Sequence, residues 1–147
     1  MQYHTQDVRL DVPDTKAEDS SMNIIKFPEL GTSLVITRGV FGAGKTLIQS
    51  FDDQIRRLQQ RMQGFKSQGR RELNIGVDGG IAAVEIQNQF RRDKETVFQF
   101  QVACAYPGKE RMLVLSYVKN SPLSEADRQH WEAFKASVQF NAPRSEA

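Results

Sequence analysis

Two spacings of hydrophobic residues alternate along the chain, and each predicts a different kind of element. From Leu47 to Phe65, apolar side chains recur at steps of three and four residues, as in an amphipathic helix. This spacing predicts a helix over residues 46–62, with Gly64 as its stop. Elsewhere apolar and polar residues mostly alternate, which is typical of half-buried strands. The strands predicted in this way span residues 3–12, 21–27, 33–38, 72–77, 81–91, 96–106 and 111–118.

Turn signals separate the later strands from one another. They lie at residues 78–80 (Asp-Gly-Gly), at residues 92–95 and at residues 107–108 (Pro-Gly). Connections this short require antiparallel pairing. A second helix is predicted after Ser124, an N-cap residue with Asp127 three positions later. The order of elements therefore predicts an α+β fold, in which a largely antiparallel sheet is covered by two helices.

Length and composition favour a single globular domain. The chain has 147 residues, of which 39% are hydrophobic and 26% charged, and both values are ordinary for such a domain. We expect one domain over residues 1–140 and a flexible tail over residues 141–147. The formal net charge is +2, and basic residues are interspersed with acidic ones. This balance does not favour nucleic-acid binding.

The chain shows no sign of a membrane segment or of disulfide chemistry. Residues 1–5 lack the basic and apolar stretches of a signal peptide, and no apolar run approaches the roughly 18 residues that span a bilayer. We therefore expect a cytoplasmic protein without stable membrane association. Cys104 is the only cysteine, so neither an intramolecular disulfide nor a cysteine-based zinc site can form. We expect it to be a small, buried apolar residue.

Residues 39–46, Gly-Val-Phe-Gly-Ala-Gly-Lys-Thr, match the pattern of a phosphate-binding loop. The segment lies between a predicted strand and a predicted helix. In that setting backbone N–H groups cradle phosphates, Lys45 would reach the outer phosphates and Thr46 would hold Mg²⁺. A nucleotide-binding protein is therefore one hypothesis.

The rest of the chain argues against this reading. Phosphate-binding loops belong to parallel sheets, whereas the tight turns here predict antiparallel strands. The acidic residue best placed for Mg²⁺, Asp78, sits in a Gly-Gly turn. His4 and His130 lie at opposite ends of the chain and suggest no catalytic triad, and we expect His130 on a helix surface. We therefore predict a protein that is not an enzyme and has no cofactor or metal. Residues 39–46 would then be a glycine-rich loop with Lys45 in solvent.

The two predicted strands before this loop are apolar on both faces. In the first strand Met22 and Ile24 share one face, and Ile25 and Phe27 share the other. In the second strand Val35 points away from its two apolar neighbours. The long helix can cover one face of this hairpin. The other face needs another chain, a ligand or a dimer partner, unless loops or the N-terminal strand cover it.

Glutamines alternate on two successive predicted strands, at Gln87 and Gln89 and at Gln99 and Gln101. A face of uncharged amides can form hydrogen bonds with a partner without the desolvation cost of charged groups. The alternative is an ordinary solvated sheet face.

The order of elements and several short motifs resemble the Eag chaperones, adaptor proteins of bacterial type VI secretion whose domain is related to the DcrB and PsbP-like folds. The resemblance extends from Tyr3 to Phe140. The motifs that carry it are Ser21-x-Asn23-Ile24, Val35-Ile36-x-Arg38, Gly64-Phe65 after the helix, Gln99-x-Gln101 and the late Trp131.

The resemblance implies a homodimer that binds the N-terminal transmembrane helices of secreted effectors in the cytoplasm and holds them until they are loaded onto the secretion spike. It also implies apolar groove residues at Met22, Ile24 and Val35, with polar groove residues at Gln54 and Gln101. A groove of this kind needs apolar walls and a few amide hydrogen bonds, and it needs no cofactor. Two alternatives stay open: a nucleotide-binding protein that uses residues 39–46, and a relative with the same fold that acts in envelope homeostasis.

Overall fold

The computed structural model describes residues 2–13, 16–107 and 111–141. Within these residues, nine strands and two helices follow one another along the chain. Their bounds are β1 Gln2–His4, β2 Arg9–Asp11, β3 Asn23–Phe27, β4 Thr32–Val40, α1 Leu47–Arg61, β5 Gln63–Ser67, β6 Arg71–Ile75, β7 Ile81–Arg92, β8 Glu95–Ala105, β9 Arg111–Lys119 and α2 Glu125–Ser137.

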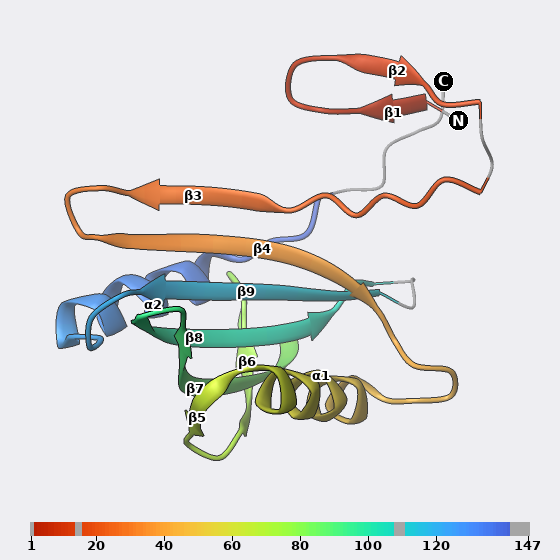
Figure 1. Cartoon of the computed structure of the whole chain (residues 1–147). Helices are drawn as coiled ribbons and strands as arrows, with labels where there is room; N and C mark the ends of the chain where they lie inside the picture. Colours follow the sequence, from red (N-terminus) through yellow and green to blue (C-terminus); the bar gives the residue numbers. More distant parts are fainter. Residues whose placement is uncertain (1, 14–15, 108–110, 142–147) are drawn as a thin grey trace.

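Seven of the strands form one antiparallel sheet in the order β3-β4-β9-β8-β7-β5, with β6 also paired to β7. Strands β1 and β2 form a separate hairpin, which lies beyond β3 in Figure 1. Strand β3 is therefore an edge strand of the main sheet.

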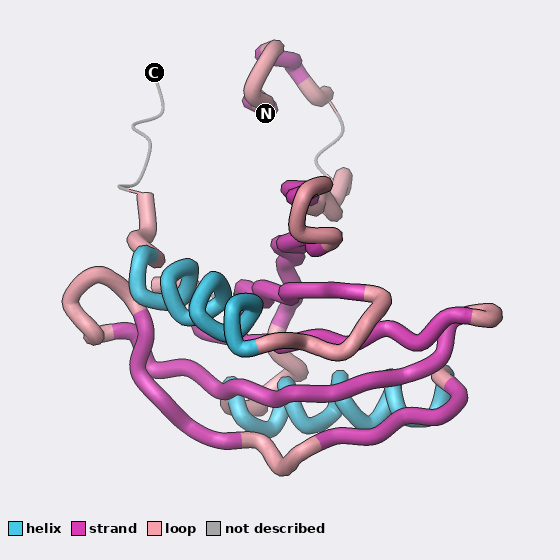
Figure 2. Tube along the Cα trace, turned by 90° about the vertical axis from the view of Figure 1, so that its left-hand side faces the viewer, coloured by secondary structure: helices cyan, strands magenta, loops and turns pink. Residues whose placement is uncertain are grey.

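The two helices cover opposite faces of this sheet, so that the domain has three layers (Figure 2). Helix α2, which leads to the C-terminal end, lies on one face, and α1 lies on the other. We call these the α2 face and the α1 face. The predicted α+β architecture, a largely antiparallel sheet with two helices, is confirmed.

The α2 face holds the larger hydrophobic core. Trp131 and Tyr117 are fully buried and pack with Phe100, whose ring stacks on that of Trp131 at 6.0 Å between centroids. The carboxylate of Glu85, also buried, accepts hydrogen bonds from Trp131 Nε1 and Lys135 Nζ, both at 2.6 Å. The buried charge of Glu85 is thus paired with a cation from the helix and fixes α2 to β7.

Helix α1 begins and ends where the sequence predicts. Thr46 is its N-cap, and the Thr46 and Gln49 side chains each accept a hydrogen bond from the other residue's backbone N–H. The backbone N–H of the C-cap residue, Met62, donates to Leu58. Phe51 is the helix's buried anchor and packs against the α1 face. The main contacts of α1 with the sheet are with β8 and β5, so the helix covers only part of the sheet and leaves Ile24 of β3 exposed.

Two predicted elements are wrong in detail. The single strand predicted over residues 3–12 is the β1–β2 hairpin, because Thr5 Oγ1 accepts the backbone N–H groups of Asp7 and Val8 and turns the chain. Phe65, counted in the helical pattern, lies in β5, a strand that the sequence analysis did not predict. The left-handed backbone of Gly64 (φ 65°) accompanies this change of direction.

The cover of the β3–β4 hairpin also differs from the prediction. Helix α2, and not the long helix α1, covers the face that carries Phe27 and Leu34. His130, expected on the helix surface, is half-buried there: its Nδ1 lies 2.8 Å from the Tyr117 hydroxyl, and its ring meets that of Phe27. The predicted tail beyond Asn141 and Gly108 of the predicted turn lie outside the described residues.

Candidate functional site

One row of side chains crosses four strands on the α1 face. Ile24 of β3 is paired with Val35 of β4, Val35 with Ser116 of β9, and Ser116 with Gln101 of β8. Residues directly opposite each other in a sheet project from the same face. These four side chains therefore form a continuous series, which we call the cross-strand row. It is apolar at the β3 edge and polar toward the middle of the sheet.

The apolar end of the row is open to solvent. Ile24 is 53% exposed, and Met22, which precedes β3, is 57% exposed. A shallow pocket of about 380 Å³ lies along the row, with Ile24, Val35 and Ser116 among its lining residues. Large exposed side chains beside such a pocket are typical of an interaction surface.

Gln101, at the polar end of the row, and Asn88, its diagonal neighbour on β7, carry amide atoms without partners among the described residues. Gln101 Nε2 donates to Ser116 Oγ at 3.1 Å. Gln101 Oε1 and both side-chain polar atoms of Asn88 have no hydrogen-bond partner among the described residues. Asn88 is only 4% exposed and is paired across the sheet with the buried Gln99. Each unpartnered buried amide atom costs about 1–3 kcal/mol, which a ligand that supplies the missing hydrogen bond can recover.

Gln54 borders the same face from helix α1. Its Nε2 lies 3.2 Å from the position that a Cβ atom would occupy at Gly39, so the glycine lets the helix approach β4 closely. Gly39 and Val35 project from the same side of β4 and are separated by about 13 Å along the strand. The structure therefore brings Ile24, Val35 and Gln101 into one row, with Met22 at its outer margin and Gln54 at the far end of β4.

The glutamine pairs do not share a face. Gln87 is paired with Phe100 and Gln89 with Phe98, so both glutamines of β7 lie on the α2 face. The single face of four amides predicted from the sequence is wrong, because the turn between β7 and β8 pairs odd-numbered residues with even-numbered ones.

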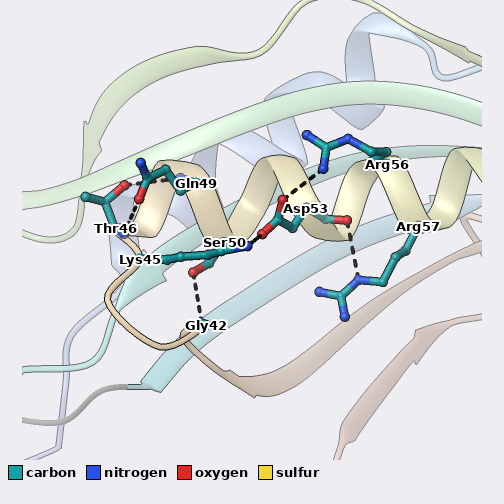
Figure 3. A network of polar contacts seen from close by, with 8 residues as sticks. All are labelled: Gly42, Lys45, Thr46, Gln49, Ser50, Asp53, Arg56 and Arg57. Carbon is teal, nitrogen blue, oxygen red and sulfur yellow. Dashed lines mark hydrogen bonds and ion pairs between the residues drawn. The ribbon is translucent and has the colours of Figure 1, made fainter.

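The polar groups of segment 39–46 form hydrogen bonds and an ion pair with other residues of the protein. Gly39 and Val40 belong to β4 and pair with β9, which is antiparallel. Lys45 forms an ion pair with Asp53, as Figure 3 shows, and Thr46 caps α1. The hydrogen bond from Lys45, together with its charge and that of Arg56, lowers the pKa of the exposed Asp53 carboxyl. Lys45 is exposed to solvent, as predicted, and is also paired with Asp53.

The surroundings of this segment also differ from those of a phosphate-binding loop. Asp78, the proposed Mg²⁺ ligand, sits in the β6–β7 turn, where its Oδ1 accepts the Gly80 N–H at 2.9 Å. The start of that turn is held against the C-terminal end of α2 by a hydrogen bond from Gly76 N to Lys135 O. Asp78 therefore lies near the C-terminal end of α2, whereas Lys45 lies at the start of α1.

The remaining candidates for chemistry are separated. Cys104 is fully buried, as predicted, and burial raises the pKa of its thiol to about 11. His4 lies in the exposed β1, far along the chain from His130 on α2. Residues 2–13, 16–107 and 111–141 contain no group of three or more histidine, cysteine or acidic side chains placed to hold a metal ion.

The sequence did not single out Ser116, which lies in the row and lines its pocket, or Asn88, which lies beside the row with unpartnered amide atoms. Ser116 is the one small polar residue within the apolar stretch Met112–Val118, and that interruption is the available signal. Asn88 lies between two glutamines and on the opposite side of β7 from both. Only the register with β8 places it beside Gln99.

No helix in the described part of the chain is long and apolar enough to cross a membrane.

Comparison with known proteins identifies the family of the chain. No curated protein matches the sequence. The solved structure of a Pseudomonas aeruginosa protein, PA94, described as being of unknown function, superposes with a TM-score of 0.70 at 26% identity, covering 99% of this chain and 98% of that one. The DcrB family model matches residues 8–137, and the chain therefore belongs to the DcrB family.

Proposed function

We propose that this protein binds hydrophobic helices on its α1 face and acts as a cytoplasmic chaperone for the N-terminal transmembrane segments of type VI secretion effectors, before these are loaded onto the secretion spike. The observation that carries the proposal is the cross-strand row, in which the exposed Ile24 leads to Gln101, whose Oε1 has no hydrogen-bond partner among the described residues. The role is binding, without a chemical step.

The physical chemistry of a membrane helix matches this row. Such a helix exposes about 20 apolar residues and aggregates in water unless it is covered. Burying the exposed part of Ile24 against it removes apolar area from water, at about 25 cal/mol per Å². Small polar side chains such as serine, which often mediate helix packing in membranes, can supply hydrogen bonds to Gln101 and Asn88. The row thus resembles the surface of a neighbouring membrane helix.

A homodimer is part of the proposal. A row four strands wide covers only one side of a helix, so a second copy is needed to cover the other. The β1–β2 hairpin supports this because it packs little against the rest of its own chain, and a lone two-stranded hairpin is marginally stable. Its exposed Val8 and Leu10 are available to a second copy. Sedimentation equilibrium should give about twice the chain mass of 16.7 kDa, and a monomer at micromolar concentration would contradict this part of the proposal.

A pair of adjacent substitutions tests the binding face. Ile24 and Ile25 are 53% and 47% exposed, but they project from opposite faces of β3. The probe is a leucine-rich helix of about 20 residues with one central serine, flanked by lysines for solubility. Ile24→Asp should weaken binding at least tenfold, because it places a charge against the apolar helix, whereas Ile25→Asp should retain affinity. Fluorescence anisotropy measures both, and equal losses or no loss would remove the α1 face as the site.

Two further variants separate the hypotheses. Gln101→Leu should abolish the preference for the serine peptide over a peptide with leucine in its place, because the variant lacks the amide that forms a hydrogen bond with the serine hydroxyl. Lys45→Ala should leave peptide binding unchanged. Nucleotide binding by the parent protein that is lost in Lys45→Ala would instead support the nucleotide-binding alternative.

A further inference from the structure

A second pocket lies on the opposite, α2 face, where the end of β4 and the start of β9 meet the chain after α2. Its volume is about 350 Å³, which falls within the range of small-ligand sites. Six of its lining residues define its chemistry: Ile36, Arg38, Tyr106, Arg111, Leu113 and Phe140. We call it the arginine pocket.

The pocket has an apolar floor and an aromatic wall. Ile36 and Leu113 are half-buried and pack against the core of the α2 face. Tyr106 and Phe140 meet edge to face, with ring centroids 5.3 Å apart. These four side chains provide a surface suited to an apolar or aromatic group of limited size.

Two arginines stand on the same side of this floor. Arg38 of β4 is paired with Leu113, and Arg111 is two residues from Leu113 on β9, so the two arginines are diagonal neighbours on one face. Like charges in this relation repel each other. None of the described residues that line the pocket is acidic. An anion between the two guanidinium groups would relieve the repulsion.

The arginines also have donor groups that no other described residue occupies. Only Nη1 of Arg38 donates to other described residues, to Asn23 Oδ1 at 3.0 Å and to the Ser21 carbonyl at 3.4 Å, and both acceptors are neutral. The pKa of the nearby Asp19 carboxyl is lowered mainly by hydrogen bonds from Ser21, with the Arg38 charge as the smallest contribution. The remaining nitrogens of Arg38 and the side chain of Arg111 can thus donate to a carboxylate.

We propose that the arginine pocket is a binding site for a peptide carboxylate with an adjacent aromatic or large apolar side chain. The carboxylate lies between Arg38 and Arg111, and the apolar group lies on Ile36 and Leu113 beside Tyr106. The site is on the face opposite the cross-strand row, so it does not depend on the proposed helix binding and leaves that row free. A protein partner could be held here while a helix occupies the other face.

The test uses small probes and the full chain. N-acetyl-Ala-Phe carries a free α-carboxylate, N-acetyl-Glu-Phe-amide carries a side-chain carboxylate, and N-acetyl-Ala-Phe-amide is neutral. Titrations followed by backbone amide NMR shifts should show binding of at least one acidic probe, about tenfold tighter than the neutral probe, with shifts at residues that line the pocket. The tighter of the two acidic probes identifies the source of the carboxylate.

Variants locate the site and control for general charge. Arg111→Gln should weaken the acidic probe about tenfold and leave the neutral probe unchanged. Arg61→Gln, at the exposed end of α1, removes the same charge elsewhere and should change nothing. Arg38→Gln should act like Arg111→Gln, and its melting temperature is measured alongside because it also loses the hydrogen bond to Asn23. Equal affinity for acidic and neutral probes, or equal losses in Arg61→Gln and Arg111→Gln, would overturn the proposal.

Discussion

The two faces of the sheet are built from the same strands but differ in how completely they are closed. On the α2 face, Trp131, Tyr117 and Phe100 fill the space under the helix, and the buried Glu85 has partners for both carboxylate oxygens. On the α1 face, Phe51 anchors a helix that leaves the β3 end of the sheet uncovered, where Ile24 is exposed.

The difference is one of closure: the α2 face is more fully packed, and the α1 face carries the surface that we propose for binding. Among the described residues, the α2 face leaves one buried side-chain atom without a partner, Thr32 Oγ1, whereas the α1 face leaves three, on Asn88 and Gln101. A closed face stabilises the fold. On the other face, a ligand that covers the exposed apolar residues and forms hydrogen bonds with the unpartnered amides gains binding free energy.

The largest expected effect comes from the centre of the closed face. Trp131→Ala should lower the free energy of unfolding by about 3–5 kcal/mol, because it opens a cavity and removes the Nε1 donor from Glu85. Ile24→Ala, on the open face, should cost less than about 1 kcal/mol, because the side chain is already half in water. Urea unfolding at pH 7 measures both. Similar losses in the two variants would contradict this difference in closure.

A smaller loss is expected at the buried ion pair. Glu85→Gln should lower the free energy of unfolding by about 2–3 kcal/mol, below the 3–5 kcal/mol typical of a stranded buried charge. The reason is that Lys135 retains Glu132 as an ionic partner at 2.9 Å. Glu132→Gln, a matched change at an exposed carboxylate, should be close to neutral.

The same carboxylate makes the closed face sensitive to acid. Burial raises the pKa of Glu85, but hydrogen bonds from Lys135, Trp131 and Arg71 together outweigh burial, and the pKa in the folded protein lies below its ordinary value. Its contribution to stability is therefore complete above the unfolded pKa of about 4.3 and is lost as pH falls through the lowered folded pKa. Unfolding measured from pH 7 to pH 2 should show the parent and Glu85→Gln converging at acid pH, and a constant difference would show that ionisation of Glu85 contributes nothing.

A loss smaller than those at Trp131 and Glu85 is expected at the start of α1. Thr46→Ala removes the hydroxyl that accepts the Gln49 N–H and should cost about 1 kcal/mol. Thr46→Ser keeps this acceptor and serves as the control. If Thr46→Ala also leaves peptide binding intact, Thr46 acts as a helix cap and not in recognition of the peptide helix.

Local rules were enough to predict most elements from the sequence. The cap at Thr46, the cap at Ser124 and the turn at Asp78-Gly79-Gly80 each fix a boundary through hydrogen bonds between residues close in sequence. The structure confirms both helices and the antiparallel meander from β6 to β9. Ile24 and Val35, which were predicted as site residues, do lie opposite each other.

Features set by contacts across strands were harder to predict. Phe65 continues the helical spacing, and only its pairing partner β7 shows that it lies in a strand. The error over Gln87 and Gln89 was avoidable, because the two-residue turn at Asp93-Lys94 fixes the register of β7 and β8. No local sequence pattern shows which helix covers which face of the sheet, because both helices have an apolar side.

The position of β3 at the edge of the sheet has a practical consequence. An uncovered edge whose side chains include Ile24 and Ile25 can add strands from any other chain, and this strand has one Lys and no proline to oppose such addition. The isolated chain is therefore expected to aggregate as its concentration rises. Coexpression with the helical segment that we propose as the ligand should raise the yield of dispersed protein, and Ile25→Lys offers a way to handle the isolated chain without altering the face that carries Ile24.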